Sequence, residues 1–427
     1  MKFAIKLFSK TFGSVLVLPA IIISGVAQLR AQAAQPIRPA RQETLLNGLR
    51  TAVFPQKVGT KVFLKLRVHA GAAFDRQDKE GTMSLLAGSF FPNPTAGEFF
   101  REDLGGHLEI STTYDYIQIS ASARADEFLT LVEAIGNAIA NPSIDKQSVA
   151  SLKQAQIEQI AAAERDPAFR GERAVLARLF GKFPYGRPIK GTRQSLANID
   201  FADVIDAKKR FLVADNASVA ISGPVDPSLA VRAVKRYFGA WSKADKSVPA
   251  TFRQPDSPPS EVLVVEEDAL PDFWVAFDGV PRGNAGFPAA EILGEILKFR
   301  LKANLTRDET SADVKNRSYL LRGAFAIGLP AGELEDAREF VRALIAKPIE
   351  QGEFESAKAK AVTAYLNLGA DDIWLDSETY KSISLANAAA AISSVEIADL
   401  RSLQTRLAAE PFVAVRFSKK ASPAAIR

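Results

Sequence analysis

The order of hydrophobic patterns along this 427-residue chain occurs twice, and this repetition constrains the fold more than any other feature. Each copy runs strand, helix, strand, a pair of helices split by a proline, a further helix and a final strand. Strands and helices of this kind each bury one face, so each copy predicts a mostly antiparallel sheet covered by helices. The predicted fold class is therefore α+β with two duplicated domains. The matching segments are 60–71 with 272–280, 114–123 with 321–330, 125–160 with 332–366, and 201–223 with 395–418.

A polar, proline-rich stretch without periodicity, residues 242–260, separates the two copies and is predicted to be a linker. The division that we predict is a signal peptide (1–33), a flexible lead-in (34–42), an N-terminal domain (43–241), the linker (242–260) and a C-terminal domain (261–420).

The first 33 residues have the composition of a secretory leader. Lys2, Lys6 and Lys10 precede an apolar run from Phe12 to Leu29, and residues 31–33 read Ala-Gln-Ala. The apolar run approaches the length that spans a membrane, but a proline in its middle and the small-residue exit favour cleavage over anchoring. We therefore expect an exported protein of the bacterial periplasm without a stable membrane anchor.

The amino-acid composition argues against a nucleic-acid partner and excludes disulfide bonds. Setting aside the four basic residues of the leader lowers the formal net charge from +5 to +1, and no basic run remains. Nucleic acid is therefore not an expected partner. The chain has no cysteine, so disulfides contribute nothing and stability must come from the hydrophobic cores.

Five segments of the chain together resemble one family. They are NGLRTAVFP (47–55), VHAGAAFDRQDKEGTMSLLAG (68–88), LGGHLEISTTYDYIQISASA (104–123), FPYGRPIKGTRQSL (183–196) and VADNASVAISGPVDP (213–227). Their order and spacing are similar to those of the pitrilysin/insulinase-like (M16) zinc peptidases. The resemblance covers about 200 residues of the first domain, and it extends to the second domain by pattern alone.

Members of this family carry an inverted His-x-x-Glu-His motif on the helix that begins near Gly81, and a further glutamate on a later helix completes the zinc ligands. The resemblance places Ser84 and Gly88 at the two histidines and Ala87 at the general base. Gln159 falls at the distal ligand, one residue from Glu158. Neither glycine nor alanine can bind zinc, and a serine hydroxyl is a poor lone ligand. The resemblance thus implies a non-catalytic member with no metal and no cofactor.

Other side chains do not supply a replacement site in the sequence. The only histidines are His69 and His107, which are interpreted as a partly buried strand residue and a surface turn residue. No sequence signal brings these two together. The carboxylate pairs at 266–267 and 371–372 are interpreted as solvated loop acids, because neither lies in a calcium-loop pattern.

In the resembling peptidases the second domain supplies an arginine and, seven residues later, a tyrosine, which stabilise the oxyanion. The resemblance places Thr306 and Asp313 at these positions. Arg307 lies one residue from the first position, and Tyr319 lies too far along for the second. The helper role that partner subunits of the family have is therefore not indicated here.

Peptide binding remains possible without zinc, because backbone groups do most of the work when a peptide adds to a sheet edge. In the resembling enzymes this edge follows a double glycine, which here places the contacts at Glu109, Ile110, Ser111 and Thr112. The function that we predict is a non-catalytic subunit that pairs with a zinc-bearing peptidase subunit as a heterodimer and helps to enclose peptides. A standalone peptide-binding or scaffold protein of the envelope is the alternative, and a metallopeptidase with an unconventional site ranks last.

Overall fold

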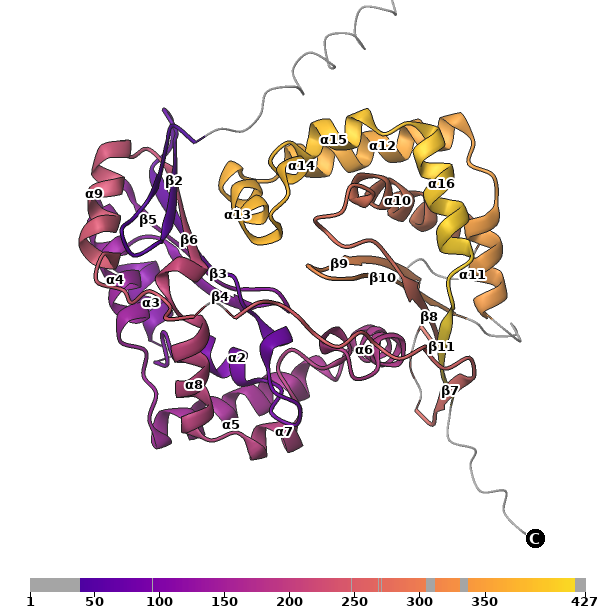
Figure 1. Ribbon diagram of the computed structural model, residues 1–427, viewed down its shortest axis with the longest axis horizontal. Helices are drawn as coiled ribbons and strands as arrows, with labels where there is room; N and C mark the ends of the chain where they lie inside the picture. Colours follow the sequence, from indigo (N-terminus) through magenta and orange to yellow (C-terminus); the bar gives the residue numbers. More distant parts are fainter. Residues whose placement is uncertain are drawn as a thin grey trace, which may run out of the picture. The chain divides into compact units, whose positions relative to one another are not determined.

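Two sheets organise the protein, and their central strands are buried on both faces (Figure 1). The computed structural model describes residues 39–93, 95–246, 248–267, 269, 271–304, 312–330 and 337–418. All of these residues fall in one compact unit of the chain.

The first sheet has six strands in the order β1-β2-β6-β3-β5-β4 among the described residues. β2 and β6 run parallel, and all of the other neighbours are antiparallel. The strands are β1 (Arg41–Thr44), β2 (Arg50–Pro55), β3 (Lys61–Val68), β4 (His107–Thr112), β5 (Ile117–Arg124) and β6 (Ala217–Gly223).

The second sheet repeats this arrangement, with no counterpart of β1 in the part of the chain that the structure describes. Its order is β7-β11-β8-β10-β9, again with one parallel pair, β7 with β11, next to antiparallel neighbours. Because order and direction agree strand by strand, the predicted duplication of a mostly antiparallel sheet is confirmed. The strands are β7 (Val262–Val265), β8 (Phe273–Asp278), β9 (Asp313–Ser318), β10 (Gly323–Leu329) and β11 (Val413–Phe417).

Helices cover the sheets, and several begin where a side chain caps the first free backbone N–H groups. Asp145 accepts hydrogen bonds from the N–H groups of Gln147 and Ser148 at the start of α5, and Asp200 accepts one from the N–H of Asp203 at the start of α8. The helices of the first half are α2 (Thr82–Gly88), α3 (Ala96–Glu102), α4 (Phe128–Ala140), α5 (Lys146–Ala163), α6 (Pro167–Phe180), α7 (Arg193–Asn198), α8 (Phe201–Phe211) and α9 (Pro227–Phe238), with 3₁₀ turns η1 (Ala72–Phe74), η2 (Ala125–Glu127), η3 (Pro184–Gly186) and η4 (Ala214–Asn216). Those of the second half are α10 (Phe287–Asn304), α11 (Ala337–Ala346), α12 (Gln351–Leu366), α13 (Ala370–Tyr380), α14 (Ile383–Ala386), α15 (Ala388–Ser394) and α16 (Ile397–Ala408).

The proline breaks were predicted correctly: Pro142 separates α4 from α5, and Pro348 separates α11 from α12. The predicted lead-in differs at its end, because Arg41 and Gln42 already pair with β2 as part of β1. The predicted signal peptide lies outside the described residues. Within the described ranges, no helix is both long and apolar enough to cross a bilayer. The described residues of 242–260 form no helix or strand.

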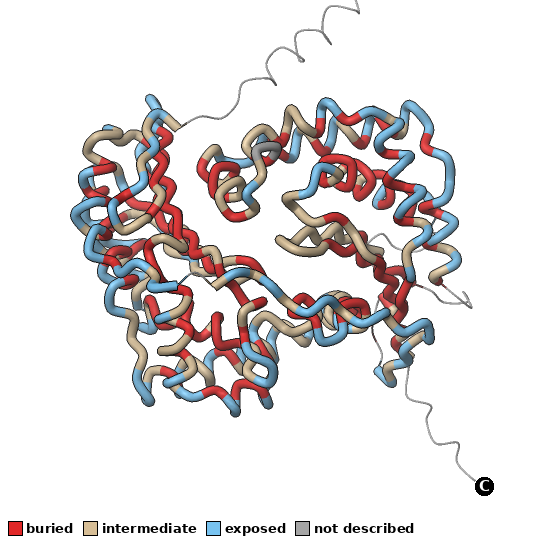
Figure 2. Tube along the Cα trace, in the orientation of Figure 1, coloured by how far each residue is buried: buried red, intermediate tan, exposed pale blue. Residues whose placement is uncertain are grey.

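Each sheet has its main hydrophobic core between one face and the helices of its own half. Leu64, Leu66 and Val68 of β3 are completely buried in the first core, and Val275 and Phe277 of β8 are completely buried in the second. Figure 2 shows the buried residues concentrated along the central strands, with exposed residues on the outer helices. The helices of its own half therefore do not cover the other face of each sheet.

A helix from the opposite half covers that other face. α6, which belongs to the first half, packs on β8, β10 and β11 of the second sheet. Val175 and Leu179 of α6 are buried there against Trp274 of β8. Gly171 permits the close approach, because a β-carbon at this position would overlap the indole ring of Trp274.

α13 makes the reciprocal contact from the second half onto β2 and β6 of the first sheet. Trp374 and Leu375 pack there against Ala52 and Ala220. Since α13 follows α12 as α6 follows α5, the two halves exchange equivalent helices, which the sequence patterns did not reveal.

The α13 interface also contains buried charges. Asp376 accepts hydrogen bonds from Arg67 Nη1 at 2.7 Å and from Arg282 Nη2 at 2.6 Å. Asp371 is 5% exposed, lies 3.1 Å from Lys65 Nζ and accepts a hydrogen bond from the Ser222 hydroxyl. The interpretation of residues 371–372 as solvated loop acids is therefore wrong, because both carboxylates pair with Lys65 and start a helix.

His69 completes this interface. It is half-buried, and its ring nitrogens lie 3.1 Å from the Thr379 hydroxyl of α13 and 2.9 Å from the Ser218 hydroxyl of β6. Burial, reinforced by the charges of Arg50 and Lys381, lowers the pKa of His69 well below its usual value. The folded protein therefore holds this ring in its neutral form.

The first prediction concerns the close approach at Gly171. We expect Gly171→Ala to lower the free energy of unfolding by about 1–3 kcal/mol, because the added methyl group overlaps Trp274 and overpacks the interface. Gly352→Ala is the matched control: Gly352 is a helical glycine with nothing within 4 Å of a new β-carbon, so the change should be neutral or stabilising. Urea denaturation of both variants measures the difference, and equal stability of the two would contradict the proposed contact.

The second prediction concerns the pH dependence of stability. The unfolded chain binds a proton at His69 near pH 6.5 while the folded protein does not, so the contribution of His69 is present above that pH and is lost as the pH falls. Relative to His69→Gln, which keeps hydrogen-bonding atoms but does not titrate, we expect the wild-type protein to lose about 1 kcal/mol between pH 7.5 and 5.5. Denaturation of both proteins across this range measures the loss, and parallel curves would refute the assignment.

Candidate functional site

The helix α2 is fixed at its start by a buried carboxylate. Asp75 accepts hydrogen bonds from the backbone N–H groups of Gly81 and Met83, both at 2.8 Å. A carboxylate at this end also complements the helix dipole. Burial nevertheless raises the pKa of Asp75 to about 7. The start of α2 therefore depends on a single side chain from the preceding loop.

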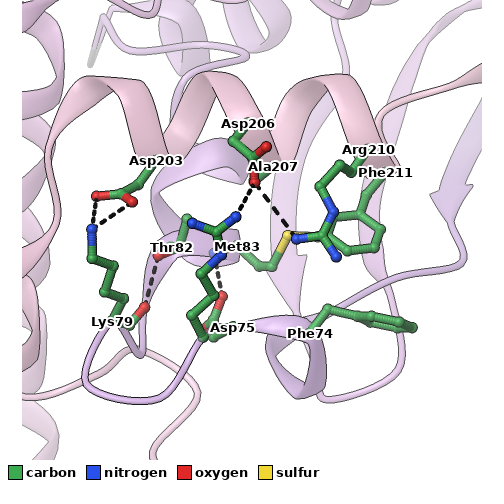
Figure 3. A pocket seen from close by; sticks show the side chains of 11 residues that line it. Phe74, Asp75, Lys79, Thr82, Met83, Asp203, Asp206, Ala207, Arg210 and Phe211 are labelled. Atoms are coloured by element: carbon green, nitrogen blue, oxygen red, sulfur yellow. Dashed lines mark hydrogen bonds and ion pairs between the residues drawn. The ribbon is translucent and has the colours of Figure 1, made fainter. Parts of the chain in front are cut away.

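Ion pairs attach the same loop to α8, as Figure 3 shows. Lys79 Nζ lies 2.6 Å from the Asp203 carboxylate, and Arg76 Nη2 lies 3.0 Å from that of Asp206. The pocket between the loop and α8 encloses about 20 Å³, which is space for about one water molecule. This pocket is too small for a substrate, and its side chains serve to hold α2.

The residues of α2 that the sequence analysis singled out have no ligand chemistry around them. Ala87 is 3% exposed and belongs to the first hydrophobic core. Ser84 and Gly88 are half-buried. A β-carbon at Gly88 would lie 3.0 Å from Leu152 Cδ2 of α5, so a leucine packs where a side chain at this position would point.

The helix α5, which packs on α2, carries one buried and one exposed glutamine. Gln156 is buried and donates hydrogen bonds to the carbonyls of Gly81 at 3.3 Å and Lys190 at 2.7 Å. Gln159 is exposed, and its side-chain oxygen accepts a hydrogen bond from Lys190 Nζ at 2.6 Å. Glu158 is also exposed and accepts a hydrogen bond from Gln154. Sequence reasoning missed Gln156 and Lys190, because nothing in their local pattern distinguishes them from surface residues.

The strand β4 lies at the edge of the first sheet and beside α2. Glu109 is exposed, while Ile110, Ser111 and Thr112 are half-buried. Only β5 pairs with β4 among the described residues, so one side of β4 presents unpaired backbone groups. The structure therefore brings the predicted peptide contacts next to α2, the helix on which the family resemblance places the zinc motif.

A larger pocket lies at the end of β4 and encloses about 450 Å³. It is bounded by the ends of α5 and β4, by α6, by residues 188–191 and by two residues of the second half. The lining residues are Thr112, Thr113, Tyr114, Ile160, Ala163, Phe169, Glu172, Arg173, Leu176, Pro188, Ile189, Lys190, Gly191, Arg317 and Tyr319.

Equivalent hairpins of the two halves meet beside this pocket. Asp115, between β4 and β5, accepts hydrogen bonds from the Tyr185 hydroxyl and from the backbone N–H of Leu320, both at 3.0 Å. The Tyr319 ring lies 5.0 Å from the Tyr114 ring and 4.6 Å from the Tyr185 ring. Burial raises the pKa of Asp115 to about 6. These contacts fix the wall of the pocket that comes from the second half.

The remaining candidate residues do not assemble into a site. His107 and Phe63 are both opposite Ser122 in the first sheet, which puts His107 roughly 20 Å from His69 at 3.3 Å per residue. Asp313 begins β9 and pairs with Lys315 at 2.7 Å, while Thr306 and Arg307 lie outside the described residues. Within the described residues, no group of three or more His, Asp or Glu side chains lies close enough together to hold a metal ion.

Curated relatives match part of the chain. An uncharacterized zinc protease from Rickettsia bellii is 21% identical over 208 residues, which are 48% of this chain and 50% of that protein. An uncharacterized zinc protease from Mycobacterium tuberculosis is 26% identical over 137 residues, which are 32% of this chain and 31% of that protein. The matches thus span about half of the first relative and about a third of the second.

Solved structures match nearly the whole fold. A protease from Helicobacter pylori has a TM-score of 0.77 at 17% identity, covering 88% of this chain and 99% of that one. A peptidase M16 inactive domain from Pseudomonas fluorescens has a TM-score of 0.78 at 16% identity, covering 90% and 98%. The periplasmic protease PqqL from Escherichia coli has a TM-score of 0.69 at 15% identity, covering 90% of this chain but 49% of that one.

Two family models match consecutive parts of the chain and together span most of it. The model described as "Insulinase (Peptidase family M16)" matches residues 51–193, and the model described as "Peptidase M16 inactive domain" matches residues 198–361. These matches agree with the duplicated sheets and with the similarity to solved structures of the same fold. The chain therefore belongs to the insulinase family of peptidases, family M16.

Proposed function

We propose that this chain is a non-catalytic member of its family, which holds peptides along β4 and completes a peptide-enclosing assembly with a zinc-bearing family subunit. The single observation that carries the proposal is the chemistry of α2. The resemblance places Ser84, Ala87 and Gly88 where family members have two histidines and a glutamate, and the surroundings of these residues are those of a packed helix.

The residues present do not fit a zinc ion. Structural and catalytic zinc sites take at least three nitrogen, sulfur or carboxylate ligands from the protein. Here one ligand position is a glycine with Leu152 packed against it, and the base position is a core alanine. The side-chain oxygen of Gln159 is already bonded to the Lys190 ammonium. The curated relatives are named zinc proteases; we propose that this chain differs from them in holding no zinc.

Binding of peptides along β4 does not need the lost side chains. Addition of a strand uses backbone N–H and C=O groups, which β4 presents along its free side. Glu109, Ile110, Ser111 and Thr112 would then flank the bound peptide. The adjacent pocket of about 450 Å³ offers space for one of its side chains.

The proposed pairing follows from the size of the fold. This chain matches 49% of PqqL, so that protease contains about twice the length of chain that the present protein supplies. Besides the part that matches this chain, that protease has a second stretch of similar length, and we propose that a zinc-bearing family subunit supplies its counterpart here. The predicted leader and the periplasmic location of PqqL support the periplasm as the place where this happens.

The third prediction tests whether zinc binding and catalysis belong to the partner subunit and not to this chain. The purified chain should contain no stoichiometric zinc and should not hydrolyse fluorogenic peptides, with or without a chelator. Mixed with a zinc-bearing family member from the same cell, it should raise peptide hydrolysis above that of the partner alone. Metal analysis and fluorescence assays measure both results.

A partner whose catalytic glutamate is replaced serves as the control, and it should be inactive in the mixture. Zinc-dependent hydrolysis by the present chain alone would overturn the proposal in favour of an unconventional metallopeptidase. Peptide affinity without any effect on the partner's activity would instead favour the standalone peptide-binding protein.

The fourth prediction tests the packing at the lost ligand position. We expect Gly88→His to lower the free energy of unfolding by about 1–3 kcal/mol, because the imidazole must displace Leu152. Adding Leu152→Ala should make the effect of the histidine smaller, and a double-mutant cycle measures this coupling. Gly97→His in α3, where nothing lies within 4 Å of a new β-carbon, is the control. Additive effects of Gly88→His and Leu152→Ala would show that the two positions are not in contact.

A further inference from the structure

The pocket at the end of β4 lies where a peptide on β4 would arrive. Thr112 is the last residue of β4, and Thr112, Thr113 and Tyr114 all line the pocket. The pocket therefore continues the path of a strand added to β4. Its lining decides which chemical groups can occupy the end of that path.

Most of the lining is apolar. Ile160 and Ala163 come from α5, Leu176 comes from α6, and Ile189 comes from the loop that follows η3. Phe169 adds an aromatic ring that is 41% exposed, which is high for so large an apolar side chain. A volume of about 450 Å³ with such walls suits a bulky apolar side chain.

The cations around the pocket differ in their partners. Arg317 donates to the Glu172 carboxylate at 2.9 Å, and Arg173 donates to that of Glu164 at 2.8 Å, so both guanidinium groups are neutralised. The hydrogen bond that the structure gives the Lys190 ammonium goes to the neutral amide oxygen of Gln159 at 2.6 Å. An ammonium has three donor hydrogens, so Lys190 can bond an incoming anion without releasing Gln159.

The surroundings of Lys190 favour an anionic ligand in a second way. Although the residue is exposed, neighbouring protein atoms partly desolvate its ammonium and lower its pKa. Among the described residues no carboxylate forms an ion pair with Lys190. A partly desolvated cation of this kind gains more from a ligand anion than a fully hydrated lysine does.

We propose that this pocket binds the C-terminal residue of a peptide, with a bulky apolar side chain inside the pocket and the terminal carboxylate on Lys190 Nζ. The proposal rests on the proposed function in one respect, that the peptide lies along β4. It adds the identity of the recognised end and of the recognised side chain.

The arrangement of the two hairpins favours a chain end over the middle of a chain. In the hairpins that form the wall of the pocket, the Leu320 N–H donates to Asp115 and the Tyr114 hydroxyl donates to the carbonyl of Arg187 at 2.7 Å. The Tyr319 ring packs on Tyr114 at 5.0 Å. The protein itself therefore occupies the continuation of β4, so a bound strand that reaches the pocket ends there.

The experiment compares two forms of one peptide. Fluorescein-labelled Ala-Ala-Val-Ala-Leu is prepared as the free acid and as the C-terminal amide, and fluorescence polarisation with the full chain gives Kd for each. We expect the acid to bind about five- to tenfold more tightly, in the range of one charge-assisted hydrogen bond at a solvated site. The difference should shrink as salt is added.

Two variants separate the carboxylate from the side chain. Lys190→Gln should bring the affinity for the acid down to that for the amide, while Lys182→Gln, a change of another exposed lysine nearby, should leave both unchanged. Ala163→Trp should fill the pocket and weaken both peptides. Circular dichroism and thermal unfolding check that each variant is folded.

Equal affinity for the acid and the amide would overturn the proposal, and so would an acid preference that survives Lys190→Gln. Absence of binding by either peptide would overturn it as well. None of these results changes the outcome of the hydrolysis assay with the zinc-bearing subunit. That assay tests the proposed function separately.

Discussion

The exchange of equivalent helices between the two halves is the constraint on which the rest of the structure depends. α6 covers the free face of the second sheet and α13 covers that of the first. Each sheet has two faces to bury, and the helices of its own half cover only one. Burying charged side chains between the two halves costs free energy unless each charge is paired. Asp376 is paired, because it accepts hydrogen bonds from both Arg67 and Arg282.

The geometry of the pocket at the end of β4 depends on this exchange of helices. Because α6 packs on the second sheet, the hairpin that ends at Gly323 is held against the hairpin that contains Asp115. The pocket at the end of β4 lies between α6 and these hairpins, so its shape is set by contacts between the halves. The edge of β4 and the helix α2, by contrast, are positioned within the first half by Asp75 and the first core.

The family fold can persist without the family chemistry because the two rest on different side chains. The sheets and helices are determined by apolar residues in alternating or helical positions, which this chain retains. A zinc site requires a few polar side chains in one place, and a helix can form without them. At Gly88, where the family resemblance places a histidine, Leu152 of α5 lies 3.0 Å from the position of a β-carbon.

The sequence by itself determined the strands, the helix pairs broken at Pro142 and Pro348, the duplication and the absence of ligand side chains on α2, because periodicity and side-chain chemistry are local properties. It also located the edge strand through the resemblance. Only the tertiary structure decided that α6 and α13 each pack on the sheet of the opposite half, that Asp371 is buried, and that Gln156 donates a hydrogen bond to the carbonyl of Lys190. Those features depend on contacts between residues far apart in the chain, such as the 309 positions between Arg67 and Asp376, and a local pattern carries no information about them.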